Sequence, residues 1–155
     1  MLGLFHNLRR LGCVLYSLFF LIFVSGTAMA APAVTVLCYH SVDPGGDIYN
    51  VTPERLREHF QYFKDQGYTV ISPKQVQAAA RGAKLPAKPL MLSFDDGYGS
   101  FYTAAYPQLK EFHYSATMFI ISSWPDTAAT KLTWQQIQAM DRSGLVRIGS
   151  HTPDI

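Results

Sequence analysis

The sequence is short of several features that mark whole classes of protein. It has two cysteines, Cys13 and Cys38, among 155 residues, and its formal net charge is only +2. Arg9 and Arg10 account for that excess, because 11 basic and 11 acidic residues remain from Ala31 onward. The chain has no basic stripe, so nothing in it favours nucleic-acid binding. The hydrophobic content of 48% excludes a disordered chain.

Long hydrophobic runs are also lacking. The longest apolar and uncharged stretch, Leu11–Val24, falls short of the roughly 20 residues that span a bilayer. Two arginines precede it, and Ala28-Met29-Ala30 has the A-x-A form of a cleavage site. This pattern predicts a signal peptide at residues 1–30 and export of residues 31–155 to the periplasm or cell surface. The alternative is a retained anchor, which would be the only part to contact a membrane.

Cleavage would leave Cys38 as the single cysteine, so the mature chain could form no internal disulfide. Cys38 lies in the apolar stretch "VTVLCYH". The simplest interpretation of Cys38 is a small, buried apolar residue.

Strand-like and helix-like segments alternate after the leader. Thr52, Ser72 and Thr133 are placed to cap helices, and Pro107 should kink or divide the helix that contains it. We expect strands at 34–40, 68–72, 88–94, 116–121 and 145–150, and helices at 52–67, 72–81, 98–112 and 133–144.

The strands are near-continuous apolar runs, which suits parallel strands that are covered on both faces. The sequence therefore predicts one α/β domain with parallel strands, flanking helices and right-handed crossovers.

Polar residues gather where the strands end. The first strand ends in His40, the third in Asp95 and Asp96, the fourth near Trp124 and the fifth in His151. Because active sites of parallel α/β folds lie at the carboxyl ends of the strands, we expect these residues to share one edge.

Structural explanations exist for single residues of this group. Asp96 precedes a glycine and could belong to a tight turn, and His40 alone could be a hydrogen-bonded structural histidine. A turn rarely needs a second carboxylate, because like charges raise each other's pKa. A carboxylate and a histidine are suitable ligands for a divalent metal, and a second carboxylate can act as general base on metal-bound water. Neighbouring side chains on an extended backbone point to opposite sides, so we expect Asp95 and Asp96 to aim differently.

These motifs resemble those of the NodB-type polysaccharide deacetylase family. "LSFDDGY" is similar to the family's first motif, TFDDG, with Ser93 in place of threonine, and "GSHTPDI" is similar to the start of its second motif. Within the family, "VLCYHSV", "FYTAAYPQLKEF", "LTWQQIQAM" and "GLVRIGSHT" resemble the exported poly-β-1,6-N-acetylglucosamine N-deacetylases of biofilm matrix synthesis.

The resemblance implies a distorted (β/α) barrel, of which this chain holds the N-terminal portion, with one divalent metal ion, commonly zinc. By position, Asp95 matches the catalytic base, and Asp96 and His151 match two metal ligands. His40 matches a histidine near the site, and Trp124 is a candidate for stacking against a sugar ring.

The resemblance also implies a third metal ligand four or five residues after His151. Ile155, four residues on, cannot bind a metal, and the family's later motifs are not in the printed sequence. We therefore expect residues 31–155 to be a deacetylase domain that is truncated at its C-terminus.

The leading functional hypothesis is a metal-dependent hydrolase that removes N-acetyl groups from an N-acetylglucosamine polysaccharide. One alternative keeps the chemistry but changes the substrate to peptidoglycan or chitin. The other is an inactive, truncated remnant that only binds glycan.

Overall fold

The computed structural model describes residues 33–45 and 48–154, which all belong to the unit formed by residues 31–155. The predicted signal peptide at residues 1–30 lies outside the described residues. Among the helices that are described, none combines the length and the hydropathy needed to cross a membrane.

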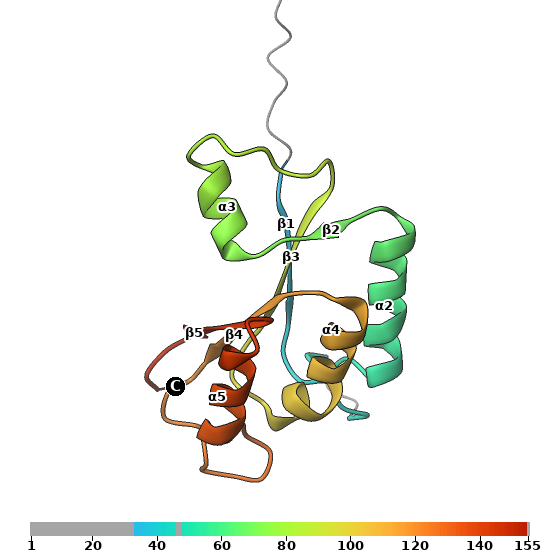
Figure 1. The fold of residues 1–155 in the computed structure, drawn as a ribbon. Helices are drawn as coiled ribbons and strands as arrows, with labels where there is room; N and C mark the ends of the chain where they lie inside the picture. The colour runs from blue at the N-terminus through green and yellow to red at the C-terminus, as the bar shows by residue number, and fades with distance from the viewer. Residues whose placement is uncertain (1–32, 46–47, 155) are drawn as a thin grey trace, which may run out of the picture. The chain divides into compact units, whose positions relative to one another are not determined.

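Parallel strands and helices alternate along the described chain, as the sequence predicts (Figure 1). The strands are β1 (Thr35–Tyr39), β2 (Thr69–Val70), β3 (Pro89–Phe94), β4 (Ala116–Ile120) and β5 (Val146–Ser150). The helices are α2 (Pro53–Asp65), α3 (Pro73–Ala79), the π-helical turn η1 (Phe101–Ala105), α4 (Tyr106–Phe112) and α5 (Trp134–Arg142).

Two of the predicted helix caps are seen directly. The Thr52 hydroxyl accepts a hydrogen bond from the backbone N–H of Arg55 at 3.2 Å. Thr133 and Gln136 form a reciprocal capping box, with bonds of 3.1 and 3.0 Å. Each cap satisfies backbone N–H groups that lack a partner within the helix.

Pro107 divides the predicted helix at 98–112 into two parts. The first part, η1, is a π-helical turn, and α4 begins at Tyr106, immediately before the proline. Proline has no N–H to donate to the preceding turn, so the regular α-helical ladder cannot pass through it. The local change to wider π-type bonding accommodates this interruption.

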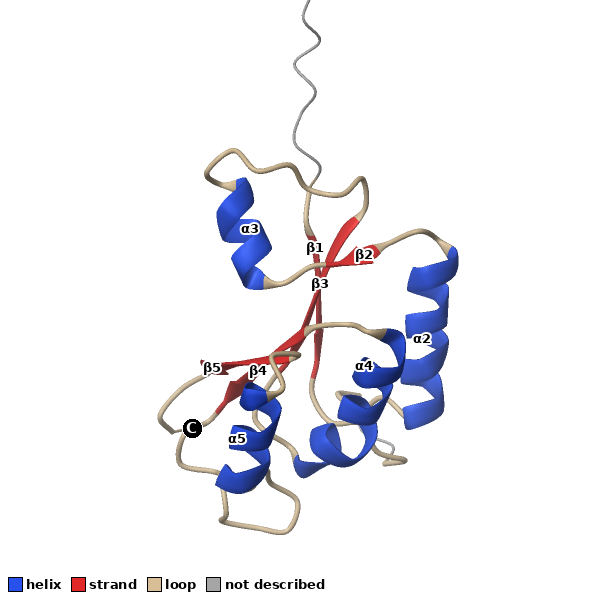
Figure 2. Ribbon diagram, in the orientation of Figure 1, coloured by secondary structure: helices blue, strands red, loops and turns tan. Residues whose placement is uncertain are grey.

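Strand β3 is the centre of the sheet (Figure 2). β1 pairs along one edge of β3, from Thr35↔Leu90 to Tyr39↔Phe94. The other edge is shared, because β2 pairs only with its beginning, at Pro89 and Leu90, and β4 only with its end. β5 then pairs with β4. The sheet thus forks at β3, and β1 lies beside β3 and not beside β2.

Burial separates the strands into two kinds. Every residue of β3 except Met91 is buried, and so is every residue of β4 except Phe119. β1 and β5 each have one neighbour in the described sheet and are partly exposed. The prediction that strands are covered on both faces is therefore correct for β3 and β4 and wrong for β1 and β5.

The prediction that Cys38 is buried is wrong as well. Cys38 lies on β1 and is exposed. Its two neighbours in the strand, Leu37 and Tyr39, are half-buried and pack against the core. The apolar run "VTVLCYH" thus contains one inward and one outward face, and Cys38 is on the outward one.

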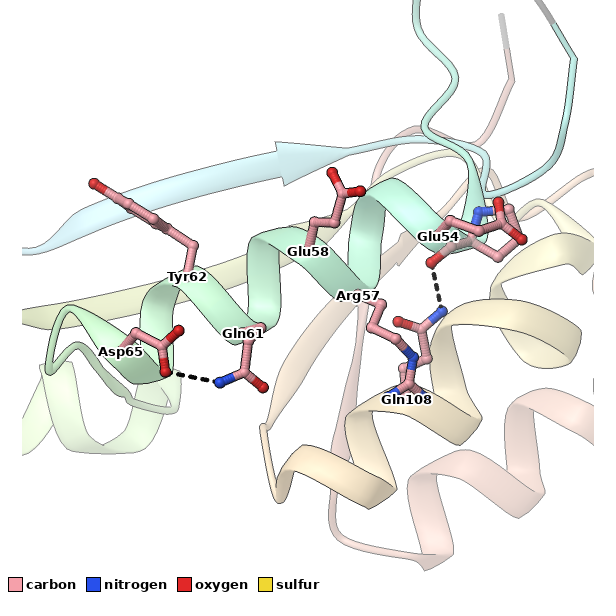
Figure 3. A pocket seen from close by; sticks show the side chains of 8 residues that line it. Glu54, Arg57, Glu58, Gln61, Tyr62, Asp65 and Gln108 are labelled. Carbon is pink, nitrogen blue, oxygen red and sulfur yellow. Dashed lines mark hydrogen bonds between the residues drawn. The ribbon is translucent and has the colours of Figure 1, made fainter.

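Helices α2 and α4 lie side by side and are joined by polar contacts. The Gln108 side chain donates to the Pro53 carbonyl at 2.9 Å, and Arg57 pairs with Glu111. A pocket of about 670 Å³ follows α2 here, as Figure 3 shows. Helix-surface residues line it and no strand end reaches it, so it is not the site that the sequence predicts.

Candidate active site

The chain turns sharply as it leaves β3. The backbone N–H of Gly97 donates to the carbonyl of Asp95 at 3.0 Å, and Asp96 between them has a φ of 73°. This hydrogen bond closes a three-residue γ-turn, and its positive φ is that of the rare, strained type. Strain of this kind is typical of functional sites. The sequence signal Asp-Gly therefore does mark a turn, and the turn carries both aspartates.

Gly97 is required at the next position for two reasons. Its φ is 90°, a value that residues with a side chain rarely adopt. A Cβ atom at this position would also lie 3.3 Å from Cγ2 of Ile120 on β4. The turn is thus packed directly against the neighbouring strand.

Backbone hydrogen bonds fasten the strand ends to one another. They run from Asp95 N to Tyr39 O (2.8 Å), from Ile121 N to Asp96 O (3.3 Å) and from His151 N to Ile120 O (2.9 Å). The ends of β1, β3, β4 and β5 therefore meet at one edge, as expected for parallel strands.

Both aspartates reach the same histidine. Nε2 of His151 lies 3.6 Å from Oδ2 of Asp95 and 3.8 Å from Oδ1 of Asp96. The side chains of Asp95 and Asp96 are 20% and 18% exposed, and that of His151 is 37% exposed. The expectation that the two carboxylates aim to opposite sides is wrong, because the γ-turn replaces the extended backbone at Asp96.

One oxygen of Asp95 has an unusual environment. Its Oδ1 atom is buried and has no hydrogen-bond partner within the described part of the chain. A buried acceptor without a partner costs free energy and normally has a functional reason. A cation or water molecule bound beside Asp95 would give this oxygen a partner.

His40 and Cys38 approach Asp95 from β1. One ligand atom from each of Cys38, His40 and Asp95 lies within 4.8 Å of the others. The sequence predicts His40 near the site but treats Cys38 as a core residue. The spacing in "CYH" could have predicted that Cys38 lies beside His40, because residues two apart on a strand share a face.

The pKa of the Cys38 thiol is raised overall by its surroundings. Partial burial raises the pKa of Cys38, a hydrogen bond with Ser93 lowers it, and the nearby Asp95 and Asp96 raise it further. A negatively charged neighbourhood therefore opposes formation of the thiolate unless a cation is present.

Trp124 lies beyond the end of β4, with its ring close to Lys131. Nζ of Lys131 is 3.1 Å from the centre of the Trp124 ring and 4.1 Å from that of Tyr98. Burial lowers the pKa of Lys131, and the charge of Asp96 raises it. A sugar ring could stack only on the opposite face of Trp124, because the ammonium group occupies one face.

Gly149 allows β5 to pack closely against β4, because it has no side chain. It pairs with Phe119, and a Cβ atom at Gly149 would lie 2.6 Å from the Phe119 ring. The aromatic ring therefore covers the glycine, and this contact stands two residues before His151.

The donor set formed by Asp96 and His151 suits a divalent metal ion. A carboxylate oxygen and an imidazole nitrogen bound to tetrahedral zinc would be roughly 3.3 Å apart. The two atoms are 3.8 Å apart here, so a small rotation of either side chain would allow both to bind one ion.

Comparisons with known proteins show what the chain is similar to. Residues 82–154 match the family model for polysaccharide deacetylase. The chain is also similar to the poly-β-1,6-N-acetyl-D-glucosamine N-deacetylase of Escherichia coli K12, with 38% identity over 75% of this chain and 20% of that protein. This chain thus contains part of a polysaccharide deacetylase domain.

Solved structures of this deacetylase family support the fold. A de-N-acetylase from Aggregatibacter actinomycetemcomitans matches with a TM-score of 0.71 and 36% identity, over 76% of this chain and 54% of that one. IcaB from Ammonifex degensii matches with a TM-score of 0.72 and 29% identity, over 78% and 53%. The expected fold, an N-terminal portion of a distorted (β/α) barrel, is confirmed. The chain spans about a fifth of the E. coli relative and about half of the solved deacetylases.

Proposed function

We propose that this chain contributes the general base and two metal ligands to a metal-dependent N-deacetylase that acts on an N-acetylglucosamine polymer. The observation that carries the proposal is the convergence of Asp95 and Asp96 on His151, within 3.8 Å, at the shared edge of the strands. The family and the names of its relatives supply the reaction class.

Asp96 and His151 would hold one divalent ion, and zinc suits their donor atoms. The bound ion would polarise the acetyl carbonyl and lower the pKa of a water molecule. Asp96 is suited to this role because the positive charge of an ion would offset the repulsion between its carboxylate and that of Asp95.

Asp95 would act as the general base. Its carboxylate accepts a proton from water as the water oxygen forms a bond to the acetyl carbon. The carbon–nitrogen bond then breaks, and the nitrogen takes up a proton, so that the products are acetate and a free amine on the sugar. The distance of 3.6 Å between Oδ2 of Asp95 and Nε2 of His151 supports this role, because it brings the carboxylate next to the proposed metal ligands.

The proposed substrate is poly-β-1,6-N-acetylglucosamine, as in the name of the E. coli relative. On this proposal, the protein would be exported through the leader at residues 1–30 and would modify biofilm exopolysaccharide. Chitin and peptidoglycan have the same acetamido group on a differently linked sugar, so the choice among them depends on linkage and not on the chemistry of the site.

An acetate-release assay tests the proposal. The protein, in the longest form that its gene encodes, is incubated with zinc and with β-1,6-linked or β-1,4-linked N-acetylglucosamine oligomers or peptidoglycan. We expect release from the β-1,6 oligomer, lowered by about 10²–10⁴-fold in Asp95→Asn, the range for a lost general base. Asp141→Asn, which removes an exposed carboxylate of α5, is the matched control and should retain full activity.

Two results would contradict the proposal. Release that is equal in Asp95→Asn and the unchanged protein would remove Asp95 from the reaction. Absence of release from all three substrates, with zinc present and the protein folded, would exclude deacetylase activity. Release from the β-1,4 oligomer or peptidoglycan alone would correct the substrate and keep the chemistry.

A further inference from the structure

A second group of metal-ligand atoms lies next to the pair formed by Asp96 and His151. It consists of the thiol of Cys38, the imidazole of His40 and the carboxylate of Asp95, with one ligand atom of each within 4.8 Å of the other two. The group spans two strands, since Cys38 and His40 belong to β1 and its end, and Asp95 follows β3.

The backbone fixes this arrangement. Cys38 and His40 are two residues apart, so their side chains leave the extended chain on the same side. The carbonyl of the intervening Tyr39 accepts the N–H of Asp95 at 2.8 Å. Asp95 is therefore held across the ladder from the middle of the Cys38–His40 pair.

Sulfur, nitrogen and oxygen ligands of these three kinds bind soft and borderline divalent cations. Thiolate favours zinc and heavier thiophilic ions, whereas magnesium and calcium prefer sets made of oxygen atoms. Ligand atoms around tetrahedral zinc are roughly 3.3–3.7 Å apart, given bonds of about 2.0–2.3 Å. A separation within 4.8 Å can close to this range by side-chain rotation, with water as the fourth ligand.

Two members of the group, Cys38 and His40, face a groove, whereas Asp95 lies outside its lining. The groove has a volume of about 430 Å³, which would let an ion enter from solution. Asp95 and Asp96 contribute two carboxylates near the thiol, and Arg55 contributes one positive charge to the groove lining. The two carboxylates outnumber the single positive charge, so the surroundings would stabilise a cation bound to the thiolate.

We propose that Cys38, His40 and Asp95 form a second cation site, selective for thiophilic divalent ions and distinct from the pair Asp96 and His151. The regulatory consequence rests on the proposed function: an ion on this site engages the carboxylate of the general base. Zinc or cadmium above the level that supports activity would then inhibit the deacetylase through Asp95.

Cadmium binding tests the site without any assay of activity. The reduced full chain is titrated with Cd²⁺, and the thiolate-to-cadmium charge-transfer absorbance in the ultraviolet is recorded. We expect saturable absorbance that is lost in Cys38→Ser and kept in Asp141→Asn, which changes an exposed residue of α5. Loss of an outer-shell partner alone lowers metal affinity about 10–100-fold, so His40→Gln should weaken binding by at least about tenfold.

Other outcomes of this titration would overturn the site. An unchanged affinity in His40→Gln would mean that a solitary thiol binds the ion. Loss of the absorbance in Asp96→Asn would mean that an ion on the Cys38 thiolate also needs Asp96, so that the site is not distinct from the pair formed by Asp96 and His151. Absorbance that persists in Cys38→Ser would exclude Cys38 altogether.

The inhibitory role is tested separately, with acetate release measured against rising Cd²⁺ or Zn²⁺. We expect Cys38→Ser to have normal activity at low zinc and to need at least about tenfold more ion for inhibition. Equal inhibition of both proteins would overturn this role. If no protein releases acetate, the proposed function fails, while the absorbance titration still decides whether the cation site exists.

Discussion

Strand β1 pairs with β3 along the whole length of β1, yet the two strands differ in burial. β3 is buried at nearly every position, with a neighbour on each edge, whereas β1 has one neighbour in the described sheet and exposes Val36 and Cys38. β3 thus holds the aspartates at a fixed place, and β1 presents His40 and Cys38 to solvent beside them. The difference shows that one ladder can join a buried strand, which fixes side chains in place, to an exposed strand beside it.

The largest effect should come from truncating the buried strand. Leu92 of β3 is 1% exposed, and Val36 of β1 is 56% exposed. We expect Leu92→Ala to lower the free energy of unfolding by about 2–5 kcal/mol and Val36→Ala to change it by less than about 0.5 kcal/mol, both measured by urea denaturation. Similar losses in the two variants would break the comparison, because they would show that β1 is covered in solution.

A smaller effect is expected at the turn that follows β3. Gly97→Ala should cost about 1–2 kcal/mol for its positive φ and more for the contact with Ile120. Gly67→Ala is the matched control, because its φ is 73° and a Cβ there meets nothing within 4 Å. Urea midpoints should therefore rank Gly97→Ala below Gly67→Ala. An equal loss would mean that the turn does not pack tightly against β4.

The smallest effect should occur outside both strands, at the exposed pair of Arg57 and Glu111. A hydrogen bond from Arg57 holds the pKa of Glu111 below its ordinary value. The pair of Arg57 and Glu111 therefore contributes to the free energy of unfolding above the ordinary pKa of glutamate. This contribution is lost as the pH falls through the lowered pKa of Glu111. Glu111→Gln should lower the urea midpoint slightly at pH 7 and low salt. The difference in urea midpoint between Glu111→Gln and the unchanged protein should vanish at high salt. A difference that persists at high salt would show that the pair stabilises the fold by more than its charges.

The order and kind of elements could be predicted from the sequence because their signals are local. Thr52 and Thr133 cap helices within three residues of themselves, and Pro107 interrupts a helix at its own position. Apolar runs and glycines fixed the strands to within a few residues. The location of Asp95, Asp96 and His151 at one edge of the sheet then follows from the parallel topology.

The remaining features depend on contacts between distant parts of the chain. β2 pairs at only two positions, so β1 lies against β3, and no local signal encodes that choice. Exposure of Cys38 follows from the place of β1 at an edge. The common aim of the two aspartates follows from the γ-turn at Asp96, which an assumption of extended backbone could not give.

Gly149 has a consequence for anyone who screens this protein by random mutagenesis. Almost any side chain at this position would collide with the Phe119 ring and push β5 away from β4, and His151 would move with it. The proposed activity would disappear although every proposed catalytic group was still encoded. A loss-of-function screen would therefore score position 149 as highly as the proposed catalytic positions, and only a measurement of folding would distinguish the two classes.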